Sequence, residues 1–181
     1  MANTILFQVL AQRCQKLNLP GITQAKFIDA GWVQTWPILQ DYEGDPTTNK
    51  AVTLASDIVL DTTAFPNAAW LTMEFTPEKN GVRVESLGDL GQEYLKTTVE
   101  GFIGTSSRET FHAFEKLLCT NVIMAVLDRN EEWRVVGRPL NPAFLRFTHD
   151  TAKAEGEAPG FAMTLEWKAH KEVPPFYDGS F

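Results

Sequence analysis

Residues 122–127 form an unbroken apolar run, Val-Ile-Met-Ala-Val-Leu, and this run restricts the fold more than any other stretch. Successive side chains of a β-strand point to opposite faces of the sheet, so a strand without polar residues is covered on both faces. The run therefore predicts a central strand with a packed layer on either side. The polar residues 128–132 predict a turn, and residues 133–137 predict the hairpin partner of this strand.

A helix is predicted just before the central strand, over residues 106–119. Ser106 and Glu109 have the Ser-x-x-Glu spacing of a capping box, in which each side chain satisfies a backbone N–H at the helix start. Apolar residues then recur at spacings of three and four, which gives the helix one buried face. These residues are Phe111, Phe114, Leu117 and Leu118.

Alternating hydrophobicity predicts most of the other strands. Residues 161–169 alternate regularly between apolar and polar positions, and residues 70–76 and 93–103 follow the same period of two. A further strand is predicted over residues 22–33 with a break at Gly31, and weaker alternation marks residues 52–60. Asn80-Gly81 is a common hairpin turn and predicts that the strand at 70–76 folds back into residues 82–85.

Roughly seven strands joined mostly by hairpins, with one internal helix, predict a mainly β (α+β) fold. The expected architecture is an antiparallel β-sandwich or barrel with one flanking α-helix. The length of 181 residues suits a single domain. We expect an N-terminal amphipathic arm at 1–20, a β core at 22–170 and an extended C-terminal tail at 171–181 that leaves the sheet at Pro174-Pro175, because proline cannot donate to a ladder.

The composition indicates a folded protein that does not bind nucleic acid tightly. A formal net charge of -7 argues against a role that depends on phosphate contacts. The N-terminus lacks the features of a signal peptide, and no apolar run approaches the roughly 20 residues that span a bilayer, so no membrane association is expected. Cys14 and Cys119 resemble small buried hydrophobes more than a disulfide or a nucleophile, and a reducing compartment is expected.

No catalytic or cofactor-binding motif can be assembled, so we expect no enzyme, no cofactor and no metal. His112, His149 and His170 lack metal-ligand spacing with one another or with the cysteines. Residues 128–132 resemble only the first positions of a calcium-binding loop, because Trp133 occupies the sixth position, where that loop needs glycine. We interpret Asp57 and Asp61 as surface charges.

The tryptophans leave two interpretations open. They could line a pocket for a small molecule or carbohydrate, which would make the protein a ligand-binding β-barrel. They could instead pack in the core or at a subunit interface, which is the more common use. The residues concerned are Trp32, Trp36, Trp70, Trp133 and Trp167.

The order of elements over residues 93–177 resembles a family of small virion proteins of tailed bacteriophages and prophages, especially those of Bacteroidetes hosts. The resemblance rests on the helix that begins Ser106-Ser107-Arg108-Glu109, the apolar strand, and the turn Asp128-Arg129-Asn130. It continues with a strand that ends at Gly137, a proline-containing segment, the closing strand and Pro174-Pro175. These family members resemble tail tube or tail ring subunits. The loop at 150–160 departs from the glycine-rich turn that relatives carry.

The resemblance implies a non-enzymatic structural subunit with a tail-tube-like fold. Such a subunit assembles into a homo-oligomeric ring, sixfold or twelvefold, contacts other tail proteins, and surrounds a lumen through which DNA passes without specific binding. The expected location is the virion, after synthesis in the host cytoplasm. The acidic composition suggests a negative lumen that repels phosphates. Candidate subunit-interface residues are Ile5, Leu6, Val9, Trp32, Trp36, Tyr42, Phe176 and Tyr177.

Overall fold

The computed structural model describes residues 21–40, 53, 54, 56–76, 79–89, 93–104, 107–117, 120–151, 159–170 and 172–181. The predicted arm at 1–20 and the loop at 41–50 lie outside these residues. The described elements are β1 (Ile22–Asp29), the 3-10 helix η1 (Ala30–Trp32), β2 (Val33–Thr35), β3 (Leu39–Gln40), β4 (Thr53–Leu54), β5 (Val59–Leu60), β6 (Leu71–Glu74), β7 (Gly81–Leu87), β8 (Tyr94–Ile103), α2 (Arg108–Leu117), β9 (Val122–Asp128), β10 (Trp133–Val136), β11 (Phe144–Asp150), β12 (Gly160–Ala169) and β13 (Phe176–Tyr177).

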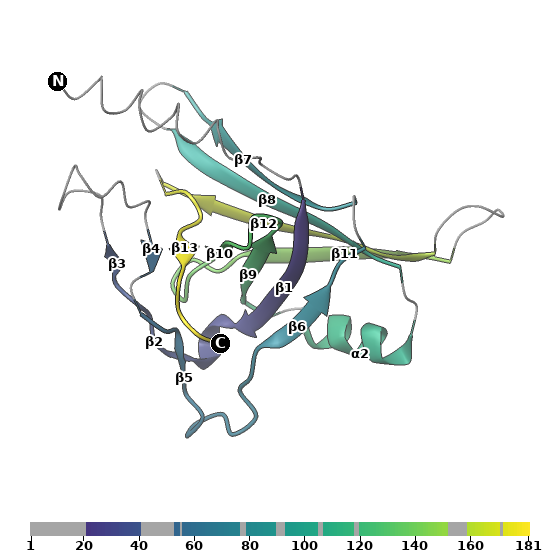
Figure 1. Ribbon diagram of the computed structural model, residues 1–181, viewed down its shortest axis with the longest axis horizontal. Coiled ribbons are helices and arrows are strands. Elements are labelled where there is room, and N and C mark those ends of the chain that lie inside the picture. Colours follow the sequence, from purple (N-terminus) through teal and green to yellow (C-terminus); the bar gives the residue numbers. More distant parts are fainter. Residues whose placement is uncertain are drawn as a thin grey trace.

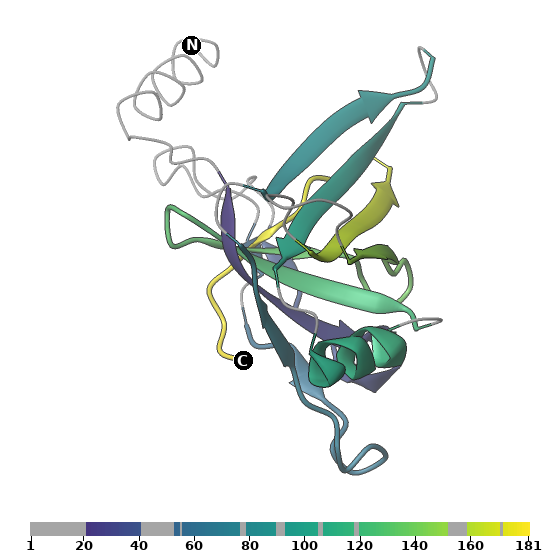
Figure 2. The ribbon, with the colours of Figure 1, turned by 90° about the vertical axis from the view of Figure 1, so that its right-hand side faces the viewer.

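Two main sheets pack on each other (Figures 1 and 2). A seven-stranded sheet has the order β3-β4-β13-β10-β9-β1-β6, and a four-stranded sheet has the order β11-β12-β8-β7; β2 and β5 form a small third sheet. The predicted mainly β, sandwich-like class is confirmed. The described strands do not close into a barrel, so the sandwich is the correct one of the two predicted architectures.

The apolar run of the sequence lies at the centre of the seven-stranded sheet, as predicted. β9 pairs with β1 on one side and with β10 on the other, and residues 122–126 have no exposed surface. Val122, Met124 and Val126 face the four-stranded sheet, while Ile123 and Ala125 face the opposite side. The sheet therefore carries an apolar cluster on each face, and a strand at this position cannot carry a polar side chain without burying it.

Helix α2 packs against one end of the four-stranded sheet. Phe114 and Leu117 are buried, and the ring of Phe114 lies 4.8 Å from that of Phe161 in β12 and 4.7 Å from that of Phe147 in β11. The predicted buried face of the helix is thus confirmed at these two positions. Phe111 stays 39% exposed, although its ring also contacts Phe161 at 4.6 Å.

The helix begins one residue later than the capping box predicts. The hydroxyl of Ser107 accepts a hydrogen bond from the backbone N–H of Thr110 at 3.2 Å, and its carbonyl accepts from the N–H of Phe111 at 3.1 Å. These two bonds make Ser107 the N-cap. Thr110 then occupies the position that the prediction gave to Glu109, which lies in the first turn and interacts favourably with the helix dipole.

The predicted hairpin at Asn80-Gly81 is wrong, because β6 and β7 belong to different sheets. Gly81 is not among the glycines with positive φ, as a type I′ turn would require. The amide of Asn80 instead donates to the carbonyl of Thr76 at 2.9 Å and accepts from the N–H of Ile22 at 3.1 Å. Asn80 therefore ties the start of β1 to the end of β6, and the chain crosses to the other sheet after it.

The prediction that the tail leaves the sheet at Pro174-Pro175 is also wrong. Phe176 and Tyr177 form β13, which lies between β10 and β4 in the seven-stranded sheet. Proline lacks an N–H, but its carbonyl still accepts, and Pro175 receives a hydrogen bond from the N–H of Val135 at 2.9 Å. The β core therefore extends beyond residue 170.

Candidate functional site

The four-stranded sheet has one apolar and one polar face. Its apolar face turns to the inter-sheet core through residues such as Val99 and Leu165, which are paired across β8 and β12. Because side chains alternate, their neighbours in the ladder point away from the core. Thr98 opposite Glu166 and Thr164 opposite Glu100 belong to this outward set. We call the outward side the polar face.

The charges of the polar face balance. Basic residues at outward positions are Arg83, Lys96, Arg146 and Lys168, and acidic ones are Glu85, Glu100, Asp150 and Glu166. The ammonium group of Lys96 lies 2.7 Å from the carboxylate of Glu166, and this hydrogen bond is the main reason that the pKa of Glu166 is lowered. The net charge of -7 is therefore carried by the rest of the chain, and this face lacks the negative excess expected of a lumen.

Both edge strands of this sheet have an unpaired side within the described part of the chain. There, β7 pairs only with β8, and β11 pairs only with β12. All three pairings of the sheet are antiparallel, so β7 and β11 run in opposite directions. Exposed apolar side chains lie on these strands, namely Val84 and Leu87 on β7 and Phe144 on β11. Exposed edges of this kind favour pairing with another chain.

The predicted interface residues that the structure describes lie on the other sheet. Trp32 and Trp36 are half-buried against the apolar cluster on its outer face. Phe176 is half-buried, with the guanidinium of Arg134 4.4 Å from its ring centroid. Tyr177 is only 2% exposed and belongs to the protein's own core. Ile5, Leu6, Val9 and Tyr42 lie outside the described residues.

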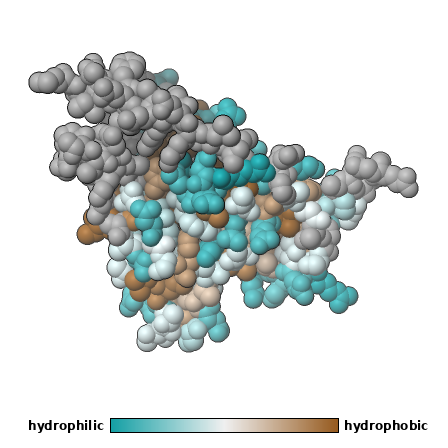
Figure 3. All heavy atoms as spheres, in the orientation of Figure 1, coloured by the Kyte–Doolittle hydropathy of each residue, from teal (hydrophilic) through white to brown (hydrophobic). Residues whose placement is uncertain are grey.

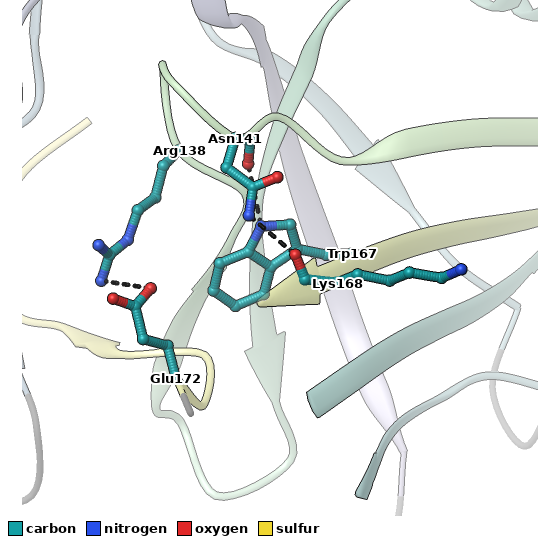
Figure 4. A network of polar contacts seen from close by, with 5 residues as sticks. All are labelled: Arg138, Asn141, Trp167, Lys168 and Glu172. Carbon is teal, nitrogen blue, oxygen red and sulfur yellow. Dashed lines mark hydrogen bonds and ion pairs between the residues drawn. The ribbon is translucent and has the colours of Figure 1, made fainter. Parts of the chain in front are cut away.

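The five tryptophans do not converge on one pocket. Trp167 is buried between the two main sheets, while the other four pack on the outer cluster of the seven-stranded sheet. The indole N–H of Trp167 donates to the carbonyl of Asn141 at 2.9 Å, and the amide of Asn141 donates to the carbonyl of Lys168 at 2.8 Å (Figure 4). Nearby, Arg138 pairs with Glu172 at 3.0 Å. This network fixes the turn at 138–141 against the end of β12.

Three aromatic rings and a lysine surround Phe181. The ring of Phe181 lies 5.1 Å from that of Trp70, 4.6 Å from that of Trp133 and 5.0 Å from that of Tyr177. The ammonium group of Lys26 lies 4.1 Å from the centroid of the Phe181 ring, which is within cation–π range. We call Lys26, Trp70, Trp133 and Tyr177 the aromatic clasp. Figure 3 shows apolar side chains gathered where Figure 1 places this end of the chain.

Polar contacts hold the residue before Phe181. The carboxylate of Asp57 accepts from the N–H of Ser180 at 2.8 Å and from its hydroxyl at 2.9 Å. The backbone bond is the main cause that lowers the pKa of Asp57. The hydroxyl of Tyr177 donates to the carbonyl of Ser180 at 2.6 Å and accepts from the N–H of Ile58 at 3.2 Å. Burial raises the pKa of Tyr177, so this hydroxyl stays a donor at neutral pH.

Sequence reasoning missed this arrangement. Asp57 was expected to be a plain surface charge, yet it binds a residue 123 positions further along the chain. No local pattern connects the two positions, because they come together through the place of β13 between β10 and β4 in the sheet. The aromatic residues themselves were the one available signal, and Trp70 and Trp133 do contact the same ring, that of Phe181.

The described residues contain no group of three or more histidine, cysteine, aspartate or glutamate residues placed to hold a metal ion. Among them, His112 lies 3.9 Å from Glu115, with both side chains largely exposed. The ring of His149 contacts those of Phe111 and Phe161, both at 4.6 Å. In this part of the chain, no helix has the length and apolar character needed to cross a bilayer.

The fold and its surfaces define a mainly β, two-sheet sandwich with a helix packed at one end. Comparisons with protein-family models, with curated proteins and with solved structures found no match to this chain.

Proposed function

We propose that the chain is a structural subunit of a phage tail, in its tube or in a ring, that assembles head to tail around a lumen through which DNA passes. The observation that carries the proposal is the four-stranded sheet, which, in the part of the chain that the structure describes, has two unpaired edges of opposite direction and one polar face. In this proposal the subunit works in the virion beside other tail proteins, after synthesis in the host cytoplasm, and it has no enzymatic role.

The strand order supports closure into a ring. Because β7 and β11 run in opposite directions, β7 of one copy can pair antiparallel with β11 of the next without turning the second copy over. A contact between two different surfaces is heterologous, and it closes into a ring when the rotation between copies divides the circle evenly. Closure pairs both edges of each four-stranded sheet and removes the aggregation hazard that these free edges carry.

The chemistry of the polar face supports a passage for DNA. Its acidic and basic residues balance, and threonine hydroxyls at Thr98, Thr148 and Thr164 lie among them. Affinity for DNA grows with the number of phosphates that lysine and arginine neutralise. A face without excess positive charge therefore leaves DNA free to slide, which is what a conduit requires. The proposed lumen is thus balanced in charge, in place of the negative lumen expected from the overall composition.

Light scattering at increasing protein concentration, followed by negative-stain imaging, tests the proposal. The expected products are rings or stacked tubes. Two adjacent substitutions in β7, Arg83→Pro and Val84→Pro, test the edge itself. In an antiparallel pair, the N–H and C=O groups of one residue point to the partner strand, and those of the next residue point away. One variant therefore breaks a bond to β8, while the other removes only an outward donor.

The variant that loses the outward donor should keep the wild-type melting temperature and lose the rings. Its neighbour should lose thermal stability. A wild-type protein that stays monomeric at high concentration, or two variants that assemble as well as the wild type, would contradict the proposal.

A further inference from the structure

We propose that the aromatic clasp is a binding site for a partner protein's segment in which a serine precedes an aromatic residue. Residues 178–181 occupy the clasp in this structure as an internal competitor. The inference concerns the outer face of the seven-stranded sheet and does not depend on ring formation by the other sheet.

The clasp is built by the sheet and not by its occupant. Lys26 lies in β1, Trp133 in β10 and Tyr177 in β13, and Trp70 directly precedes β6. All four elements belong to the seven-stranded sheet, whose ladder fixes their spacing. The Tyr177 hydroxyl is positioned by the N–H of Ile58 independently of residues 178–181. A site of this kind persists when its occupant leaves, so little ordering cost opposes a second ligand.

The contacts that hold the occupant are partly exposed to solvent. Phe181 remains 38% exposed although three rings surround it. Ser180 is bound by Asp57 and by the Tyr177 hydroxyl, and the Asp57 contacts are exposed to solvent. Exposed hydrogen bonds and ring contacts each contribute little net stability, so a segment with the same chemistry can compete.

The contacts define the ligand. Three aromatic rings and the Lys26 ammonium group accept an aromatic side chain, because the cation lies over the ring at 4.1 Å. At the residue before the aromatic one, the Asp57 carboxylate accepts hydrogen bonds from both the backbone N–H and the hydroxyl of Ser180. The Tyr177 hydroxyl donates to the carbonyl of Ser180. A serine followed by phenylalanine satisfies every one of these groups. An aliphatic residue in place of the phenylalanine would lose the ring and cation contacts.

The test uses full-length protein and a fluorescently labelled peptide, Tyr-Asp-Gly-Ser-Phe, blocked at both ends. Phe181→Ala vacates the aromatic part of the clasp. We expect this variant to bind the peptide at least about tenfold more tightly than the wild type, because the wild-type clasp is free for only a fraction of the time. Fluorescence anisotropy measures the binding. Peptides with alanine in place of serine or phenylalanine should bind at least several-fold more weakly.

Second variants in the Phe181→Ala background locate the site. Lys26→Met keeps the length of the side chain and removes the cation, and Trp133→Ala removes a wall; both should weaken binding. Val173→Ala, at a half-exposed apolar position outside the clasp, is the matched control and should leave binding unchanged. Circular dichroism confirms that each variant is folded, and the Lys26 variant keeps the test valid if the Trp133 variant unfolds.

Three outcomes overturn the inference. In the first, Phe181→Ala protein fails to bind the peptide at millimolar concentration. In the second, Lys26→Met and Trp133→Ala bind it as tightly as the Val173→Ala control. In the third, Phe181→Ala protein does not bind the peptide and instead forms dimers as its concentration rises, which would assign the clasp to a second copy. Failure of ring assembly with intact peptide binding would contradict only the proposed function.

Discussion

At the scale of single residues, Gly101 shows how closely the two main sheets approach. A Cβ atom at this position would overlap the ring of Phe75, which is itself buried. We expect Gly101→Ala to lower the free energy of unfolding by about 1–3 kcal/mol, the usual range for overpacking a core. Urea denaturation measures the change.

Gly81→Ala is the matched control, because a Cβ atom at Gly81 meets nothing within 4 Å. This variant should be within about 0.5 kcal/mol of the wild type, or slightly more stable through the reduced entropy of the unfolded chain. Equal destabilisation of both variants would show that the contact with Phe75 is not the cause.

The carboxylate of Asp57 makes the contact with Ser180 sensitive to acid. Its pKa is lowered by the hydrogen bonds from Ser180, so the bound state favours the ionised form. The resulting stabilisation is complete above the ordinary pKa of the group, 3.8, and is lost as the pH falls through the lowered value in the folded protein. We expect residues 178–181 to loosen below about pH 3.8 and tryptophan fluorescence to change, since Phe181 then leaves Trp70 and Trp133.

Asp57→Asn provides the control for this acid transition. The amide cannot titrate and accepts only through its oxygen, so the variant should show the looser fluorescence signal already at neutral pH and no further change that depends on this residue. An acid transition of the same midpoint and amplitude in the variant would assign the titration to another group.

At the scale of elements, substitutions at the start of α2 distinguish the N-cap seen at Ser107 from the capping box of Ser106 and Glu109 predicted from the sequence. The Ser107 hydroxyl accepts from the N–H of Thr110, so Ser107→Ala should destabilise the protein by about 1 kcal/mol. Glu109→Gln should cost no more than a few tenths of a kcal/mol, because among the described residues Glu109 contributes through the helix dipole. Thermal unfolding compares the two variants. A larger loss for the glutamate variant would restore the capping box predicted from sequence.

The elements that the sequence predicted correctly are those whose pattern reports burial directly. β9 was recognisable because its residues 122–127 are all apolar, and β12 because apolar residues alternate along it. The strand at 70–76 was also recognised, but its connection was not. Asn80-Gly81 has the composition of a hairpin turn, yet the Asn80 amide is used to bridge Thr76 and Ile22. Local composition cannot show which distant groups will compete for a side chain.

At the scale of the whole molecule, the sequence predicted the class of fold but not its surfaces. Sheet order, the two edges of the four-stranded sheet and the aromatic clasp all depend on which strands become neighbours. Phe176 and Tyr177 were expected in a tail outside the sheet, and their place between β10 and β4 is what brings Ser180 to Asp57. Long-range pairing of this kind leaves no periodic trace in the chain, because a two-residue strand is too short to show one.

The last prediction concerns which face of the subunit lines the lumen of the proposed ring. Thr98→Lys and Thr164→Lys together add two positive charges to the polar face of each subunit. If this face lines the lumen, assembled rings of the variant should retain a short linear DNA duplex in a salt-dependent way, since added lysines neutralise phosphates. A closed circular DNA has no end to enter the ring, so it should be retained far less. Filter binding compares the two forms.

The matched control places the same two charges elsewhere. Thr62 and Thr63 are exposed in the segment between β5 and β6, on the other sheet's side of the sandwich, and Thr62→Lys with Thr63→Lys changes the net charge by the same amount. Lysines on an outer surface meet linear and circular DNA alike, so this control should not discriminate between them. If the polar-face variant also binds both forms equally, the face lies on the outside of the assembly. The proposed head-to-tail pairing of β7 with β11 would then have to curve the sheet in the opposite direction.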